Sequence, residues 1–253
     1  MLDIFGFTET KLTDDIKSLY EIIGYQQFAL NNKRNSGGVA IYVKNNLSNI
    51  KVRSDLSRKT DHLECLFLEC TIDSYTFLCG VLYRRPNSNM NSYFEDLNII
   101  LDIISGESKI SISMGDNNLN LLNMSNNINV NNLVNLFHSY NYFDLINKPT
   151  RVTSNSTTLI DHIWSNNYAN SVLNGILYTN ISDFPVFSIF NLNVNKPQNS
   201  QYIYYKVREL SRTNIENFKD ALNDTDWGLV ISSTDANVCY DNFITLFSSL
   251  FNR

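Results

Sequence analysis

The amino-acid sequence predicts a layered α/β fold in which two β-sheets pack as a sandwich, with a short helical C-terminal extension. Runs of apolar, β-branched and aromatic residues, separated by Asn, Gly and Ser, are typical of strands and hairpins. Helical patterns lie between these runs, and carboxylate residues follow several of them directly. Because apolar residues make up 43% of the 253 residues, the composition excludes a disordered chain.

Most of the predicted strands lie in the first third of the chain. Residues 2–8 are expected to form a strand that ends beside Glu9, and Asp14 to Ile23 a short helical stretch. Four further strands are predicted, with a hairpin turn at Asp73-Ser74: they are Tyr25–Leu30, Gly38–Val43, Leu63–Ile72 and Tyr75–Tyr83.

An amphipathic helix is predicted after these strands. Glu95 and Asp96 are placed in its first turn and Gly106 at its C-terminal cap. Its apolar stripe has helical spacing and consists of Tyr93, Leu97, Ile100, Leu101 and Ile104.

The next strand, Lys109–Met114, leads into Gly115-Asp116. Residues 117–135 hold 10 Asn in 19 positions, so they are expected to form a loop before a helix around Leu133–Tyr140. The last strands of this region are predicted at Leu159–Trp164 and Pro185–Leu192.

Two domains are expected, at residues 1–195 and 196–253. Beyond the polar stretch Lys196–Ser200 the apolar residues recur at helical spacing on either side of Trp227. The second domain is therefore expected to be a helical linker. Its two stripes are Ile215, Phe218 and Leu222, and Cys239, Phe243, Leu246, Phe247 and Leu250.

The composition of the chain indicates in which compartment the protein is expected and which classes of partner it is expected to bind. No run of about 18 apolar residues exists, so no membrane partner is expected, and the first dozen residues lack the apolar core of a secretory signal. Cys65, Cys70 and Cys79 lie in strand-like runs without a C-x-x-C pair, which favours reduced thiols inside the cell, in the nucleus or cytoplasm. The net charge of −5 is unusual for a general DNA binder, but it suits carboxylates that hold a cation.

Five segments carry a resemblance to a known family: Glu9–Leu12, Gly37–Tyr42, Val81–Pro86, Gly115–Asn118 and Arg151–Asn166. They resemble the endonuclease/exonuclease/phosphatase family, and within it the endonuclease domain of non-LTR retrotransposon polyproteins. Each segment alone has low specificity, whereas five in the family's order are highly specific. The resemblance covers about residues 2–193, and the tail resembles the connector that precedes a reverse transcriptase.

The resemblance implies a metal site and a catalytic group. Glu9 matches the metal-binding glutamate, with Asp183 as a second metal ligand, and Mg²⁺ or Mn²⁺ is expected to bind weakly. Asp116 matches the residue that aligns or deprotonates the attacking water, and Asn118 the one that holds the scissile phosphate.

Four further residues take their expected roles from the same resemblance. Tyr83 matches a tyrosine that hydrogen-bonds the phosphate, and Asp161 the carboxylate that orients the catalytic histidine. Arg151 and Thr158 match positions that contact the DNA backbone.

Three departures from the family pattern concern the chemistry. The closing Ser-Asp-His step is here Ser182-Asp183-Phe184-Pro185, without the histidine. His162 is next to Asp161 on a strand, so its side chain is expected on the opposite face. Asn117 stands where the family has an aromatic residue, and the chain begins after the family's first, Asn-bearing strand.

The leading hypothesis is a Mg-dependent phosphodiesterase, a DNA endonuclease domain of non-LTR retrotransposon origin that is impaired or inactive. A catalytically dead nucleic-acid-binding remnant and a phosphatase of the same superfamily are the alternatives. The expected partner is DNA, and the expected state is a monomer that is normally tethered to a reverse transcriptase.

Overall fold

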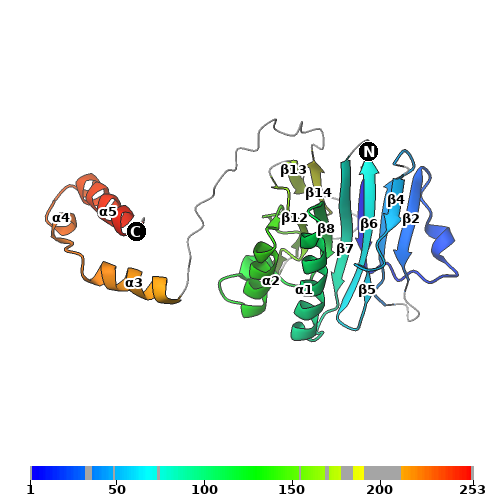
Figure 1. The fold of residues 1–253 in the computed structure, drawn as a ribbon, viewed down its shortest axis with the longest axis horizontal. Helices are drawn as coiled ribbons and strands as arrows, with labels where there is room; N and C mark the ends of the chain where they lie inside the picture. Colours follow the sequence, from blue (N-terminus) through cyan, green and yellow to red (C-terminus); the bar gives the residue numbers. More distant parts are fainter. Residues whose placement is uncertain are drawn as a thin grey trace. The chain divides into compact units, whose positions relative to one another are not determined.

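The computed structural model describes residues 2–31, 36–47, 49–72, 75–153, 155–168, 171–177, 185–190 and 212–251 (Figure 1). It divides into two compact units, Met1–Lys196 and Pro197–Arg253, which are described separately. None of the helices in the described part of the chain combines the length and apolarity that a membrane crossing requires.

The first unit is built on a large sheet, in which seven strands are found among the described residues. Strands β7 and β8 are parallel and are connected by helix α1 (Met90–Gly106), whereas the other neighbours are antiparallel. The order is β4 (Asn49–Val52), β6 (Leu63–Ile72), β7 (Tyr75–Arg84), β8 (Ile110–Asp116), β12 (Asp161–Ser165) and β9 (Phe143–Asp144), with β5 (Arg58–Lys59) paired to β6.

A second sheet packs against one face of the large sheet. Its strand order is β1-β3-β2, and its strands are β1 (Ile4–Thr8), β2 (Tyr25–Leu30) and β3 (Val39–Lys44). Two hairpins complete the described strands of this unit: β10 (Arg151–Val152) with β11 (Thr157–Thr158), and β13 (Ser171–Ile176) with β14 (Val186–Phe190).

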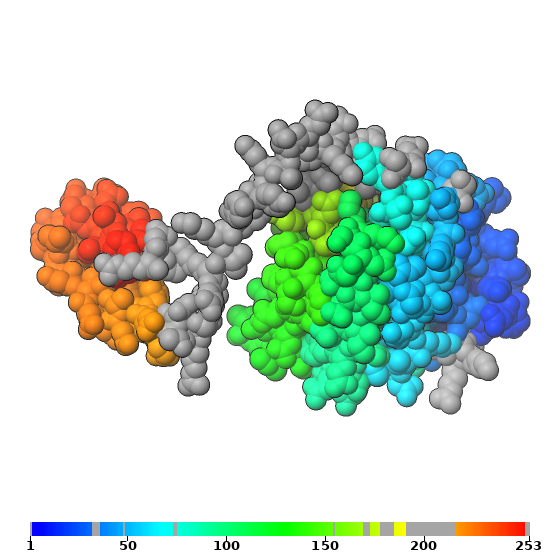
Figure 2. Space-filling view, in the orientation of Figure 1, coloured from blue at the N-terminus to red at the C-terminus, as the bar shows by residue number. Residues whose placement is uncertain are grey.

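Both faces of the large sheet are apolar, because the sheet lies between two layers. On β6, Leu63, Cys65 and Phe67 pack toward α1 and α2 (Ile128–Ser139). The alternate residues Leu66 and Leu68 pack toward the second sheet with Val39, Ile41 and Val43. The predicted two-sheet α/β sandwich is therefore confirmed, with helices α1 and α2 on the outer face of the large sheet (Figure 1). In Figure 2 the atoms of this helical region are the green ones at the surface.

The helix boundaries differ from the sequence expectations. Helix α1 begins at Met90 because the Asn89 side chain accepts a hydrogen bond from Ser92 N, so Glu95 and Asp96 lie beyond the first turn. Gly106 is the last helical residue and not the cap, and the left-handed φ of +52° after the helix belongs to Ser108.

Two other helical segments also differ in extent. Helix α2 begins at Ile128, inside the Asn-rich stretch, because the Asn127 side chain accepts from Asn129 N and Val130 N. The stretch Asp14–Ile23 contains only the 3₁₀ helix η1 (Lys17–Tyr20). The predicted turn at Asp73-Ser74 lies outside the described residues.

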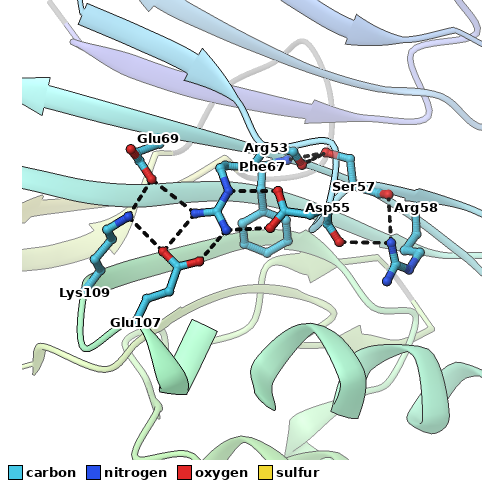
Figure 3. Close-up of polar contacts among 8 residues, drawn as sticks. All are labelled: Arg53, Asp55, Ser57, Arg58, Phe67, Glu69, Glu107 and Lys109. Carbon is cyan, nitrogen blue, oxygen red and sulfur yellow. Dashed lines mark hydrogen bonds and ion pairs between the residues drawn. The ribbon is translucent and has the colours of Figure 1, made fainter. Parts of the chain in front are cut away.

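An ion-pair cluster connects α1 to the strands at one end of the large sheet (Figure 3). Arg53, 7% exposed, pairs with Asp55 at 2.6 Å, with Glu69 at 3.1 Å and with Glu107. Lys109 bridges Glu69 at 2.6 Å and Glu107 at 2.8 Å. The Arg53 guanidinium holds the pKa of Glu107 at about 2, well below its ordinary value.

The second unit is helical where it is described. It contains α3 (Arg212–Asn223), α4 (Gly228–Ile231) and α5 (Ala236–Phe251). The Phe243 ring lies 5.8 Å from that of Trp227 and 5.5 Å from that of Phe247, which in turn lies 5.9 Å from the Phe218 ring. These aromatic contacts join α3 to α5.

Candidate active site

Glu9 follows strand β1 in a backbone conformation that is unfavourable for its residue type. Glu9 and Lys11 both have φ of +53°, a region in which residues other than Gly and Asn are uncommon. Two backbone bonds hold this turn: Thr10 N donates to Gly38 O at 3.1 Å and Lys11 N to Gly37 O at 2.8 Å. The exposed Glu9 side chain is therefore presented by a strained loop, as is common at functional sites.

Tyr83, at the end of β7, contacts Glu9 directly. Its hydroxyl donates to Glu9 Oε1 at 2.5 Å, and the Tyr83 side chain is buried. Burial raises the pKa of the Tyr83 hydroxyl, and the hydrogen bond to the Glu9 carboxylate raises it further. Tyr83 therefore remains a hydrogen-bond donor at neutral pH.

A buried carboxylate that the sequence analysis did not single out supports the Glu9 loop. Glu64, 1% exposed, accepts from Gly38 N at 2.6 Å and from the Arg85 guanidinium. A Cβ at Gly37 would lie 2.5 Å from Glu64 Oε1, and Gly37 has φ of +69°, so both space and backbone require glycine. The available sequence signal was a glutamate inside the apolar strand Leu63–Ile72.

Asp116 and Asp161 lie opposite each other at the end of two neighbouring strands. They are register partners in the antiparallel β8–β12 pair, so their side chains are on the same face of the sheet. Burial raises the pKa of Asp116 to about 7, the Asn118 N–H opposes this rise, and the charges of Asp161 and Glu9 add to it. The charges of two carboxylates from other elements therefore act on Asp116 at this edge.

Asn118 follows Asp116 in a tight turn. Its backbone N–H donates to Asp116 Oδ1 at 2.6 Å, and its φ is +49°. Its side-chain Nδ2 donates to Arg84 O at 2.8 Å. The amide nitrogen therefore bonds to the protein itself, and phosphate binding by Asn118 stays a prediction.

His162 lies on the opposite face from Asp161, as the strand alternation predicts. It is 1% exposed, its Nδ1 lies 2.8 Å from Asn117 Nδ2, and its Nε2 lies 3.1 Å from Leu159 O. Burial lowers the pKa of His162 to about 4, so the ring is neutral near pH 7. Asn117 is also buried and accepts from the Tyr93 hydroxyl at 2.8 Å, which completes a polar network below the site.

The remaining predicted site residues lie on the β10–β11 hairpin or outside the described residues. Asp183 and the Ser182–Phe184 step are outside the described residues, so its metal role stays a prediction. Arg151 is exposed on the β10–β11 hairpin. Thr158 Oγ1, on the same hairpin, is buried without a hydrogen-bond partner among the described residues, so that oxygen does not face solvent.

The donor set suits a hard divalent cation. Glu9, Asp116 and Asp161 offer carboxylate oxygens. The pKa of Asp116 is raised first by burial and then by the charges of Asp161 and Glu9, and a bound cation would offset both effects. Within the described residues no group of three His, Cys, Asp or Glu side chains is close enough to hold a metal alone. Mg²⁺ needs only one or two carboxylates with water and substrate oxygens, so the residues present fit that ion.

Comparison with known proteins identifies the fold. No protein-family description matches the sequence, and no curated protein matches it. Among solved structures, the endonuclease domain of TRAS1, a telomere-specific non-LTR retrotransposon, superimposes with a TM-score of 0.58 at 14% identity, over 69% of this chain and 84% of that one. The Xenopus laevis APE2 catalytic domain gives 0.55 at 15% identity, over 74% and 83%. The chain therefore has the DNase I-like fold of the endonuclease/exonuclease/phosphatase proteins.

Proposed function

We propose that this protein is a metal-dependent phosphodiester hydrolase, a DNA endonuclease domain of non-LTR retrotransposon origin with impaired turnover. The observation that carries the proposal is the pairing of Asp116 with Asp161 at the sheet edge where Tyr83 bonds to Glu9, whose charge also raises the pKa of Asp116. Each comes from a different strand end or the loop that follows it. The fold shared with the TRAS1 endonuclease domain supports the same reaction class.

The residues have distinct tasks in this proposal. A divalent cation at Glu9 would neutralise phosphate charge. Tyr83 orients the Glu9 carboxylate through its 2.5 Å hydrogen bond. Asp116 has a pKa of about 7 and so suits proton transfer from water near neutral pH.

The proposed loss of catalytic rate follows from the lack of a histidine that can act as the acid–base group. His162 is neutral, buried and hydrogen-bonded on the face away from Asp161, so it cannot act as the acid–base group. The sequence step Ser182-Asp183-Phe184 lacks the other candidate. Loss of one general acid–base group lowers the rate by about 10²–10⁴-fold.

The substrate and setting in this proposal come from the resemblance. DNA is the proposed partner, with exposed Arg151 contacting its backbone, and Asp183 is the proposed second metal ligand. A monomer tethered to a reverse transcriptase through residues 196–253 is the proposed arrangement. The buried free thiols Cys65, Cys70 and Cys79 suit a reducing compartment such as nucleus or cytoplasm.

A DNA-binding remnant without turnover is the second candidate function. The burial of His162 favours it, because binding through metal and Arg151 needs no imidazole. The two candidates predict the same dependence of DNA affinity on Arg151, and they differ in whether a bond is cleaved.

The test is nicking of supercoiled plasmid with Mg²⁺, Mn²⁺ or EDTA. Metal-dependent nicking that is lost in Glu9→Ala and Asp116→Ala supports the hydrolase. Asp102→Ala is the matched control, because Asp102 is an exposed carboxylate on α1, outside the site. Plasmid binding without nicking in wild type supports the remnant, and metal-dependent release of phosphate from a small phosphomonoester, with no nicking, supports a phosphatase.

A further inference from the structure

Arg84 is a buried arginine whose guanidinium bonds to the loop that carries Asp116. It follows Tyr83 at the end of β7 and is 5% exposed. Its Nε donates to Asn117 O at 2.7 Å and its Nη2 to Asn118 O at 3.0 Å. One guanidinium thus binds the two carbonyls that directly follow Asp116 in the chain.

The contact is reciprocal and the rest of the guanidinium is also fixed. Asn118 Nδ2 donates back to Arg84 O at 2.8 Å. Nη1 donates to Arg85 O and to Ser88 Oγ, both at 3.1 Å, and the guanidinium carbon lies 5.9 Å from the centre of the Tyr93 ring. Arg84 forms no ion pair with a carboxylate among the described residues, so its donors serve mainly to shape the backbone.

The loop has a conformation that its own residues do not favour without support. Gly115 has φ of +132°, and a Cβ there would lie 2.1 Å from Leu82 O. Asn118 has φ of +49°. One residue with positive φ therefore lies on each side of Asp116 and Asn117. Without hydrogen bonds from elsewhere in the protein, this loop would sample other backbone conformations. Arg84 supplies bonds to the second half of this turn.

We propose that Arg84 is a positioning residue, which fixes the loop Gly115–Asn118 so that the Asp116 carboxylate faces Glu9 and Asp161. The catalytic consequence rests on the proposed function, whereas the positioning itself does not. Lysine cannot replace this arginine, because its single ammonium cannot present the planar fork that binds two successive carbonyls.

The test compares Arg84→Lys with Arg53→Lys in the full chain. Arg53 is the matched control, since it is also a buried, multiply bonded arginine and belongs to the cluster at the other end of the sheet (Figure 3). Its partner Glu69 is five residues along β6 from Glu64, roughly 17 Å. Both substitutions keep the positive charge and replace the planar guanidinium, with its several N–H donors, by a single ammonium group.

Hydrogen exchange of the metal-free protein is the first measurement. Two amides of the loop, Asn117 N bonded to Ile160 O and Asn118 N bonded to Asp116 Oδ1, should exchange about tenfold faster in Arg84→Lys. Exchange in β6 and α1 should stay within about twofold of wild type. Arg53→Lys should show the reverse pattern.

Mn²⁺ affinity, from paramagnetic broadening, is the second measurement. The dissociation constant should rise about tenfold in Arg84→Lys and stay unchanged in Arg53→Lys. Where wild type nicks plasmid, kcat should fall in Arg84→Lys with KM unchanged, because the carboxylate is displaced and DNA binding is not.

Acceleration that is spread evenly over the large sheet, or is absent from the loop, overturns the proposal. Wild type that neither binds Mn²⁺ nor nicks DNA removes the proposed function, while the exchange result still decides the positioning role. If Arg84→Lys does not fold, Ser88→Ala removes one acceptor of the Arg84 guanidinium. Ser88→Ala should speed exchange of the same two loop amides about threefold. Unchanged exchange of these amides in Ser88→Ala overturns the proposal equally.

Discussion

Tyr83 donates a 2.5 Å hydrogen bond to Glu9 Oε1, and this bond joins the large sheet to the loop that follows strand β1 of the second sheet. Tyr83 is buried, whereas Glu9 is exposed. The bond therefore lies at the boundary between the core and the open edge where Asp116 and Asp161 meet.

Tyr83→Phe should separate the orientation of Glu9 from the stability of the fold. The ring and its packing remain, so the free energy of unfolding should fall by only about 0.5–1.5 kcal/mol, the net value of one hydrogen bond. Mn²⁺ affinity should fall more clearly, because the Glu9 carboxylate is no longer held. Calorimetric titration and urea unfolding measure the two effects. Unchanged Mn²⁺ affinity would show that Tyr83 does not orient the metal ligand.

Asp116→Asn should stabilise the metal-free protein at high pH. The Asp116 carboxyl has a pKa of about 7 when folded, against 3.8 ordinarily, so wild type loses stability as pH rises from about 4 to about 7. The amide removes that loss, which is on the order of 4 kcal/mol at pH 8 and is absent below pH 4. Denaturant unfolding in EDTA at a series of pH values measures this difference.

Asp102→Asn is the control for that prediction, because its carboxylate is exposed on α1. Curves for wild type and Asp116→Asn that stay parallel from pH 4 to 8 would contradict the burial of the Asp116 charge. Saturating Mg²⁺ should shrink the difference, since a bound cation stabilises the ionised form.

Glu107→Gln removes an ion pair of the cluster in Figure 3 and should lower the free energy of unfolding at neutral pH but not at acid pH. Arg53 lowers the pKa of Glu107 from 4.5 to about 2, so the ion pair stabilises the fold above pH 4.5 and is lost as pH falls toward 2. At pH 7 the substitution should cost about 1–2 kcal/mol, and the cost should vanish near pH 2.

A double-mutant cycle with Arg53→Met isolates the Glu107 contribution, since Asp55 and Glu69 also bind Arg53. A coupling energy near zero at pH 7 would mean that solvent screens the pair. Nicking should be unaffected, because the cluster is at the other end of the sheet from Asp116.

Insertion of His between Asp183 and Phe184 should restore metal-dependent nicking, because it supplies the imidazole that the sequence lacks. Phe184→His should restore less, since it removes an aromatic side chain as well. Plasmid nicking is compared with the same insertion carrying Asp116→Ala, which excludes a contaminating nuclease. A folded insertion variant as inactive as the parent would locate the defect elsewhere.

The two-fold periodicity of the strands made the core of the fold predictable. Tyr75–Tyr83 was expected as a strand and is β7, Tyr75–Arg84. Its alternate residues pack against two different apolar layers, so the residues on both faces of the strand are apolar and form a continuous apolar run in the sequence. The short strands β4 and β5 left no such signal, because their residues are mostly exposed and pair only at the sheet edge.

Helix ends were less predictable, because a cap depends on which of several polar residues accepts the first N–H. Asn89 caps α1, which moved its start upstream, and Asn127 caps α2 inside a stretch expected to be a loop. Asparagine suits both loops and caps, so composition alone could not distinguish them.

The sequence by itself determined the kind of chemical groups at the site and their order. Glu9, Tyr83 and Asp116 each end or follow a predicted strand, and Asp161 lies near the start of one. Only the tertiary structure decided how these groups are held. Arg84 with Asn117, and Asn117 with His162, are contacts between residues 33 and 45 positions apart. No local period encodes such pairs, because they form only when β7, β8 and β12 pair in one register and bury the polar atoms between them.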